Sequence, residues 1–455
     1  MQVIYARQAL TEHGWETDVA ITIDATGTIV DVVADVAAVG KPMDLVLPAP
    51  ANLHSHSFQR GMAGLTEQRG PDASDSFWTW RRLMYRFLDQ LTPDDVEAIA
   101  ALAFMEMAEA GFGHVVEFHY LHHGPDGAIH ENPAEMSDRI VSAAGRVGIG
   151  LTLLPVHYQF GGCDGRELSG GQVRFGNDPD LYARIHEAAR TSVASLGNQA
   201  NIGTAAHSLR AVNKAGLDMC DALGRHGPIH IHAAEQVAEV EEVQAHLGAR
   251  PVEWLLANRD IDARWCLIHC TQMTAAEVEE LAQSGAVAGL CPITEANLGD
   301  GNFAGTDFLN ERGHFGIGTD SNVQISLFAE LRALEYSQRL RDRNRSALAT
   351  QSVSTGRNLF GQALKGGARA SARNTGQLAA GFVADLVGIE TDNVTLCDRT
   401  GDTVLDSLIF GANGTQCITD MWSGGRHIVS GRRHDKRQEI EAAYRRAIAR
   451  LTSAI

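Results

Sequence analysis

Residues 228–270 read PIHIHAAEQVAEVEEVQAHLGARPVEWLLANRDIDARWCLIHC. The stretch begins and ends with short apolar runs, residues 228–235 and 265–270, which have the length of buried β-strands. Between them, in residues 237–258, apolar side chains recur every three to four positions, as an amphipathic helix requires. A strand, a helical segment and a second strand in this order are the unit from which α/β folds are built.

The same alternation of short apolar runs and longer helical segments extends from about residue 46 to about residue 370. The eight candidate strands are residues 45–56, 114–121, 149–156, 201–209, 228–235, 265–270, 286–292 and 315–320. Eight strand-plus-helix units favour an α/β fold of the (β/α)8 TIM-like barrel type. A doubly wound open sheet shows the same alternation and is the alternative.

Both ends of the chain have β character instead. The candidate strands there are residues 18–24, 28–36, 382–390, 406–413 and 418–432, and a charged helical stretch follows at 434–451. We therefore predict a smaller β-sandwich domain built from the N- and C-terminal segments. The predicted division is 1–47 for the first part of the sandwich, 48–372 for the barrel and 373–455 for the second part with its helix.

Composition and charge exclude several classes of protein. The 455 residues are 44% hydrophobic, enough to form a core, which argues against a disordered chain. The net charge of −18 would repel a phosphate backbone, so we expect no nucleic-acid partner. No apolar run reaches the roughly 18 residues that a membrane-spanning helix needs. Seven cysteines without a ligand pattern or a secretory leader indicate reduced thiols, and we expect a cytoplasmic protein.

Histidines and acids stand at the ends of the candidate barrel strands. His54 and His56 occupy alternate positions of a strand, so both imidazoles point to the same side. His232, His269 and Asp320 end the fifth, sixth and eighth candidate strands. Because the carboxyl ends of barrel strands meet at the face where active sites form, we expect these side chains to converge.

Three imidazoles and a carboxylate suit Zn²⁺, so the pattern predicts a catalytic metal site. Sites with two metals need a bridging group, commonly a carboxylated lysine on the fourth strand. The chain has only four lysines, and none lies in residues 201–209. One metal ion is therefore favoured over two.

Three residues are candidates for proton transfer beside such a metal. Glu235 follows His232 by three positions, where the strand gives way to a loop, and a carboxylate there is placed to shuttle a proton. His269 can polarise the reacting group or the water. Asp320 can both contact the metal and accept the proton of the water.

Several motifs in this order resemble the amidohydrolase superfamily, in its deaminase and chlorohydrolase branch. They are NLHSHSFQRGMAG at 52–64, HIHAAEQ at 230–236, LIHC at 267–270, GIGTDS at 316–321 and GQLAAGFVADLVGIE at 376–390. Within that branch, DSFWTWRRLMYRF at 75–87, EFHYLHH at 117–123 and LCPITEANLGDG at 290–301 resemble the formimidoylglutamate deiminases of bacterial histidine degradation. The resemblance covers nearly the whole chain.

The resemblance implies a specific reaction, the hydrolysis of N-formimidoyl-L-glutamate to N-formyl-L-glutamate and ammonia. It implies one zinc per chain, or another divalent transition metal, held by His54, His56, His232 and Asp320. It also implies that Glu235 and His269 are catalytic groups and that the protein is a homodimer.

A small-molecule substrate with two carboxylates needs guanidinium groups, which bind carboxylates in a bidentate manner. Arg210 follows the fourth candidate strand, and Arg81 lies in a Trp-rich insertion after the first, which could fold over the substrate. The substrate contacts that the resemblance implies are Gln59, Arg81, Tyr120, His207 and Arg210. The adjacent Arg82 leaves the choice between the two neighbouring arginines open.

Two other functions remain as alternatives. A deaminase of an aromatic base such as guanine, cytosine or a triazine would keep the metal site but would need stacking aromatics and amides in place of the arginines. A non-catalytic metal-binding scaffold on the same barrel is the alternative from another class. Glu235 argues against the scaffold, which has no need of an acid/base group.

Overall fold

The computed structural model describes residues 1–67, 77–411 and 413–453 and contains a barrel and a separate sheet. The barrel strands, in spatial order, are β5 (Ala51–Ser55), β6 (His114–His119), β7 (Gly150–His157), β9 (Thr204–Ala206), β10 (Ile229–Ala233), β11 (Trp265–His269), β12 (Val287–Leu290) and β13 (His314–Ile317). All neighbours in this order are parallel. A bridge between Ser55 and Asp320 brings the two edges together, so the barrel is nearly closed. The predicted fold class is confirmed, and each predicted strand overlaps one barrel strand.

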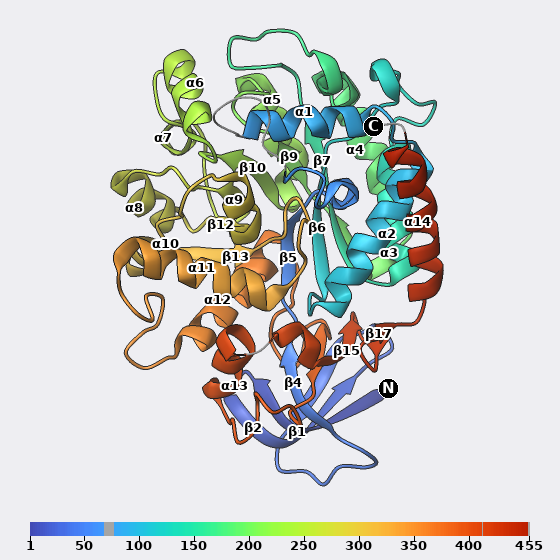
Figure 1. Ribbon diagram of the computed structural model, residues 1–455, viewed down its shortest axis with the longest axis vertical. Helices are drawn as coiled ribbons and strands as arrows, with labels where there is room; N and C mark the ends of the chain where they lie inside the picture. Colours follow the sequence, from blue (N-terminus) through green and yellow to red (C-terminus); the bar gives the residue numbers. More distant parts are fainter. Residues whose placement is uncertain (68–76, 412, 454–455) are drawn as a thin grey trace.

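Helices surround the barrel between successive strands (Figure 1). They are α2 (Pro93–Glu109), α3 (Glu135–Val147), α4 (Pro179–Ala194), α5 (Lys214–Leu223), α6 (Val237–Leu247), α7 (Pro251–Asn258), α8 (Ala275–Ser284), α9 (Pro292–Leu298), α10 (Gly305–Asn310), α11 (Leu327–Asp342) and α12 (Thr355–Ala370). Thr92 caps α2 through a capping box with Asp95. The predicted helical stretch 237–258 is two helices, because Gly248 at φ 77° ends α6 and Pro251 begins α7.

The second sheet joins the two ends of the chain, at the lower end of the molecule in Figure 1. Its strands, in spatial order, are β17 (Arg433–His434), β16 (Arg426–Ser430), β15 (Ile418–Ser423), β14 (Leu386–Ile389), β4 (Met43–Pro48), β1 (Gln2–Thr11), β2 (Gly14–Ile23) and β3 (Ile29–Val33). β4 is parallel to β1, and the other pairs are antiparallel. The predicted strand 45–56 therefore divides between the two sheets: β4 ends at Pro48 and β5 begins at Ala51.

One predicted strand, residues 406–413, is wrong. This segment is helical in the structure: α13 (Asp402–Asp406) continues into a helical turn at Ser407–Gly411. The pairs Val404 and Leu405, and Leu408 and Ile409, are all buried. Positions i, i+1, i+4 and i+5 share one face of a helix, whereas a strand would put adjacent residues on opposite faces.

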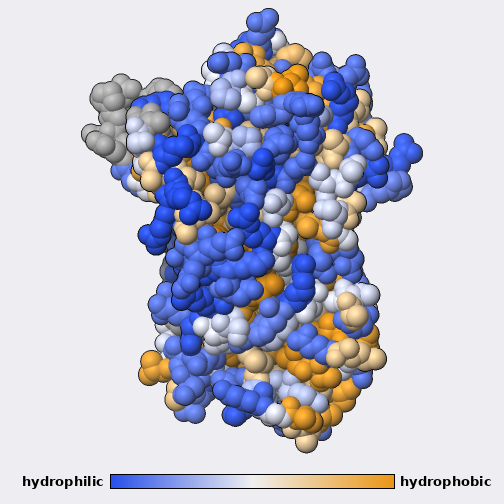
Figure 2. Space-filling model, turned by 90° about the vertical axis from the view of Figure 1, so that its right-hand side faces the viewer, coloured by the Kyte–Doolittle hydropathy of each residue, from blue (hydrophilic) through white to orange (hydrophobic). Residues whose placement is uncertain are grey.

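Two further helices matter for the surface. α1 (Phe77–Leu88) lies at the end of the barrel away from the second sheet, and α14 (Arg437–Thr452) packs against α2 (Figure 1). Figure 2 shows mostly hydrophilic residues over the barrel and more hydrophobic ones at the lower end. No helix among the described residues is long and apolar enough to cross a membrane.

Candidate active site

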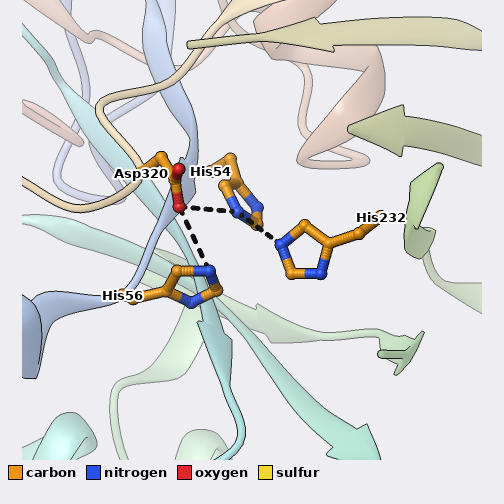
Figure 3. Close-up of side chains that lie close together, drawn as sticks. All are labelled: His54, His56, His232 and Asp320. Carbon is orange, nitrogen blue, oxygen red and sulfur yellow. Dashed lines mark hydrogen bonds and ion pairs between the residues drawn. The ribbon is translucent and has the colours of Figure 1, made fainter. Parts of the chain in front are cut away.

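Four side chains converge at the carboxyl ends of the barrel strands. His54 lies in β5, His56 directly follows it, His232 lies in β10 and Asp320 follows β13. Asp320 Oδ1 lies 3.3 Å from His54 Nε2 and 3.2 Å from His56 Nε2. His54 Nε2 lies 3.2 Å from His232 Nε2, and Figure 3 shows the four groups around one point. All four residues are buried.

The hydrogen bonds behind the cluster show which nitrogen atoms carry protons. His56 Nδ1 lies 2.9 Å from the Phe118 carbonyl oxygen, and His232 Nδ1 lies 2.9 Å from that of His207. Because a carbonyl oxygen only accepts, both Nδ1 atoms are donors, and in the neutral imidazole that binds a metal the Nε2 atom carries the lone pair. Burial also lowers the pKa of His54 to about 3, so its imidazole is neutral.

These four residues fit a divalent metal ion. Lone pairs and a carboxylate oxygen point at one another and repel unless a cation lies between them. Ligands about 2.0–2.1 Å from a tetrahedral metal lie about 3.3 Å apart, close to the separations of 3.2 and 3.3 Å found here. Carbonyl partners on the far side of two imidazoles are also typical of metal-binding histidines.

Asn322 holds the loop that carries Asp320. Its side-chain amide donates to Ser55 Oγ at 3.1 Å, to the His56 carbonyl at 3.2 Å and to the Asp320 carbonyl at 3.0 Å. Asp320 itself has φ 44°, in the left-handed region that residues other than glycine seldom adopt. Such strain persists where surrounding contacts impose it, and the fully buried Asn322 supplies them.

Glu235 and His269 lie beside the four-residue cluster. His269 Nε2 is 3.8 Å from Glu235 Oε1 and 4.0 Å from Asp320 Oδ2, while His269 Nδ1 is 3.3 Å from Glu295 Oε1. Burial alone would lower the pKa of His269, but the surrounding carboxylates outweigh it and raise this pKa well above its usual value. Burial raises the pKa of Glu235. The arrangement can hold an acidic proton next to the four-residue cluster.

A pocket opens above these groups. Its lining includes His56, His232, Glu235, His269 and Asp320, and all five predicted substrate contacts, Gln59, Arg81, Tyr120, His207 and Arg210. The remaining lining residues are Trp80, Met84, Tyr85, Tyr158, Phe175 and Leu298, which we did not single out from the sequence. An aromatic residue in a strand or helix looks the same in sequence whether it lines a pocket or a core.

The two arginines of the pocket differ in their contacts. Arg210 Nε is buried and has no hydrogen-bond partner among the described residues. Arg81 Nε donates to Tyr85 Oη at 2.5 Å, and its Nη2 donates to Tyr158 Oη at 3.4 Å. The side chain of Arg82, the other candidate, lies outside the part of the chain that the structure describes.

Models of two protein families match the chain. The model described as "Amidohydrolase family" matches residues 45–428, and the one described as "Formimidoylglutamate deiminase HutF, N-terminal domain" matches residues 1–42. Together these matches span both the barrel and the N-terminal strands of the second sheet.

Curated proteins and solved structures are also similar to it. A formimidoylglutamate deiminase of Pseudomonas aeruginosa is 44% identical over 99% of this chain and 100% of its own. A 5-methylthioadenosine/S-adenosylhomocysteine deaminase of Halobacterium salinarum is 29% identical over 82% of this chain and 80% of its own. The crystal structure of an amidohydrolase from Brucella melitensis has a TM-score of 0.95 and 47% identity, over 99% of this chain and 100% of that one. An adenosine deaminase from Xanthomonas campestris with bound zinc, 21% identical with a TM-score of 0.83, covers 99% of this chain and 98% of its own and shares the fold.

Proposed function

The chain belongs to the amidohydrolase family, and we propose that it is a deiminase that hydrolyses N-formimidoyl-L-glutamate to N-formyl-L-glutamate and ammonia in histidine degradation. The observation that carries this proposal is a pocket whose lining combines two carboxylates, Glu235 and Asp320, with two arginines, Arg81 and Arg210. Glu235 and Asp320 suit the cationic amidine of the substrate. Arg210 and Arg81 suit its two carboxylates, which guanidinium groups bind best.

We propose that the metal is a single zinc held by His54, His56, His232 and Asp320. A divalent ion there supplies Lewis acidity, which lowers the pKa of a coordinated water into the neutral range. Three imidazoles and a carboxylate are ligands that zinc prefers.

The residues of the chain would move the protons. Asp320 Oδ1 faces His54 and His56, which leaves Oδ2, the oxygen nearer His269, to take a proton from the attacking water. The water oxygen bonds to the amidine carbon, and His269 stabilises the charge that develops there. Glu235 delivers a proton to the terminal nitrogen, the bond from carbon to that nitrogen breaks, and ammonia leaves. The hydroxyl on the same carbon returns its proton to Glu235 and becomes the formyl carbonyl.

The substrate is tested by ammonia release from a panel of compounds, with metal-loaded protein. We expect N-formimidoyl-L-glutamate to be the best substrate, its aspartate analogue much weaker, and guanine, cytosine and adenosine undetectable. A neutral base would leave buried donors unpaired, which gives strong discrimination. A nucleobase that reacts faster than the amidine would contradict the assigned substrate.

The aromatic lining of the pocket is the observation that favours the alternative, deamination of an aromatic base. Tyr85, Tyr120, Tyr158 and Phe175 offer faces on which a base could stack. A base carries no carboxylate, however, so the buried Nε of Arg210 would remain without a hydrogen-bond partner among the described residues. The same panel of compounds decides between the two functions.

The metal site is tested by elemental analysis of the purified protein. We expect close to one zinc-like ion per chain as isolated, and His232→Ala should lose most of it because one of four ligands is gone. Exposed His13 provides the control, since His13→Ala should keep its metal. Full occupancy in His232→Ala would refute the assigned ligands.

A cytoplasmic location and a homodimer complete the proposal. All seven cysteines lie in the described part of the chain and none forms a disulfide, which supports a reducing compartment. The dimer follows from the resemblance to the deiminases, and light scattering after size-exclusion chromatography measures it directly.

A further inference from the structure

A second cluster of metal-binding groups lies next to the first. Glu235, His269 and Asp300 offer ligand atoms that all lie within 4.8 Å of one another, and all three residues are buried. None of them belongs to the four-residue cluster. Glu235 and His269 line the substrate pocket, whereas Asp300 is not among the residues that line it in the described part of the chain.

Asp300 is only 4% exposed, and half of its carboxylate is unpaired. Its Oδ1 accepts a hydrogen bond from the side-chain amide of Gln236, while Oδ2 is buried and has no partner among the described residues. The backbone is fixed on both sides: Gln272 donates to the Asp300 carbonyl, and the Asp300 amide donates to the Glu295 carbonyl at 2.9 Å. A buried, immobile carboxylate oxygen without a donor is costly and calls for a cation or a proton.

The charges around Asp300 also favour a cation. Burial and the nearby Glu235 raise the pKa of Asp300 to about 9. Burial likewise raises the pKa of Glu235 itself. Two acids that resist ionisation together are both stabilised as anions when a positive ion lies between them.

We propose that Glu235, His269 and Asp300 form a second site for a divalent metal ion, which fills when zinc is in excess and then inhibits the enzyme. One imidazole and two carboxylates are a ligand set that zinc uses in open, three-residue sites. The inhibition rests on the proposed function, because the ion would hold the two groups, Glu235 and His269, that the reaction needs free.

The geometry makes this second site the weaker one. Glu235 Oε1 and His269 Nε2 are 3.8 Å apart, compared with about 3.3 Å for ligands of a tetrahedral zinc. The side chains must move together to bind, next to a first cation that repels the second. An amidine substrate needs the same carboxylate, Glu235, so zinc and substrate should compete.

The experiment uses zinc as the probe and compares the wild-type protein with Asp300→Asn, which keeps the size of the side chain but removes its charge. After equilibration with excess zinc, elemental analysis should find about two ions per wild-type chain and about one per variant chain. The inhibition constant for zinc should rise by at least about tenfold in Asp300→Asn. Replacing even a residue that only supports a metal ligand lowers metal affinity by about that factor. Turnover at low zinc should persist, because Asp300 does not line the pocket.

Asp307→Asn is the matched control. Asp307 lies seven residues further along, its side chain is 67% exposed, and its replacement should change neither the zinc count nor the inhibition. If Asp300→Asn does not fold, Glu235→Gln replaces it, since it should also bind about one zinc ion per chain. This count can be measured without enzyme activity.

Two outcomes would overturn the second site. One is a second zinc that remains bound in both Asp300→Asn and Glu235→Gln. The other is an inhibition constant for zinc that is unchanged in Asp300→Asn. The zinc count requires no substrate, so it stands even if the protein acts on a compound other than N-formimidoyl-L-glutamate. Zinc that binds in two equivalents but does not inhibit would contradict the inhibitory role alone.

Discussion

Glu235→Gln is expected to lower kcat by about 10²- to 10⁴-fold while the metal content stays near the wild-type level. The amide has the shape of the carboxylate but cannot deliver a proton to the leaving nitrogen. Glu235 is not one of the four residues that point at the metal position, so its replacement leaves that set intact. Steady-state kinetics and elemental analysis of the same preparation measure the two quantities together.

The control for this variant is Glu241→Gln in α6, which makes the same chemical change at an exposed position. Surface substitutions of this kind have small effects, so its kcat should stay within about twofold of wild type. If Glu235→Gln also retained its turnover, Glu235 would have no place in the mechanism. A loss of metal together with activity would instead make it a ligand or a structural support.

The fold was predictable because the spacing of apolar residues along the chain differs between strands and helices. In residues 228–270, two apolar runs and one helical stretch predicted β10, β11 and the helices between them. The failures came from segments in which local pattern and tertiary context conflict. Ile409 has high strand propensity, but Leu408 and Ile409 together with Val404 and Leu405 cover one buried helical face.

Breaks inside apolar runs were also hard to predict. Residues 45–56 look like one strand, yet the chain passes from one sheet to the other between Pro48 and Ala51. Proline lacks the amide hydrogen that a strand ladder uses, and Pro48 and Pro50 lie at this passage. The two prolines marked the break in the sequence. The sheet that β4 or β5 joins, however, depends on partner strands far along the chain.

The sequence predicted that the metal-binding histidines and the aspartate lie close together, because the carboxyl ends of barrel strands converge. It missed Asn322 and Glu295, which support the site from the loop after β13 and from α9. It also missed Asp300 in the loop after α9, which lies next to Glu235 and His269 but is not among the residues that line the pocket. A polar residue in such a segment looks like an ordinary surface residue. Its burial and hydrogen bonds, such as the three that Asn322 donates, exist only in the folded chain. The catalytic and binding roles of the predicted residues remain predictions, which the kinetics of variants at Glu235 and Arg210 test.

Arg210→Met is expected to lower kcat/KM for N-formimidoyl-L-glutamate by at least about 10²-fold. Truncation of one partner of a buried charge pair costs roughly 2 to 5 kcal/mol, because the other charge loses its counterpart. Arg210 lines the pocket, its Nε is buried without a partner among the described residues, and a substrate carboxylate would supply one. Methionine keeps much of the length and apolar body of the side chain, so the pocket should stay packed.

The exposed Arg225 gives the matched control, since Arg225→Met makes the same chemical change at a residue that is not part of the pocket lining. Its kcat/KM should stay near wild type. Arg210→Lys should fall between the two, because an ammonium restores the charge but not the bidentate contact with a carboxylate. If Arg210→Met and Arg225→Met had equal kcat/KM values, the carboxylate would bind elsewhere and Arg210 would have no part in selecting the substrate.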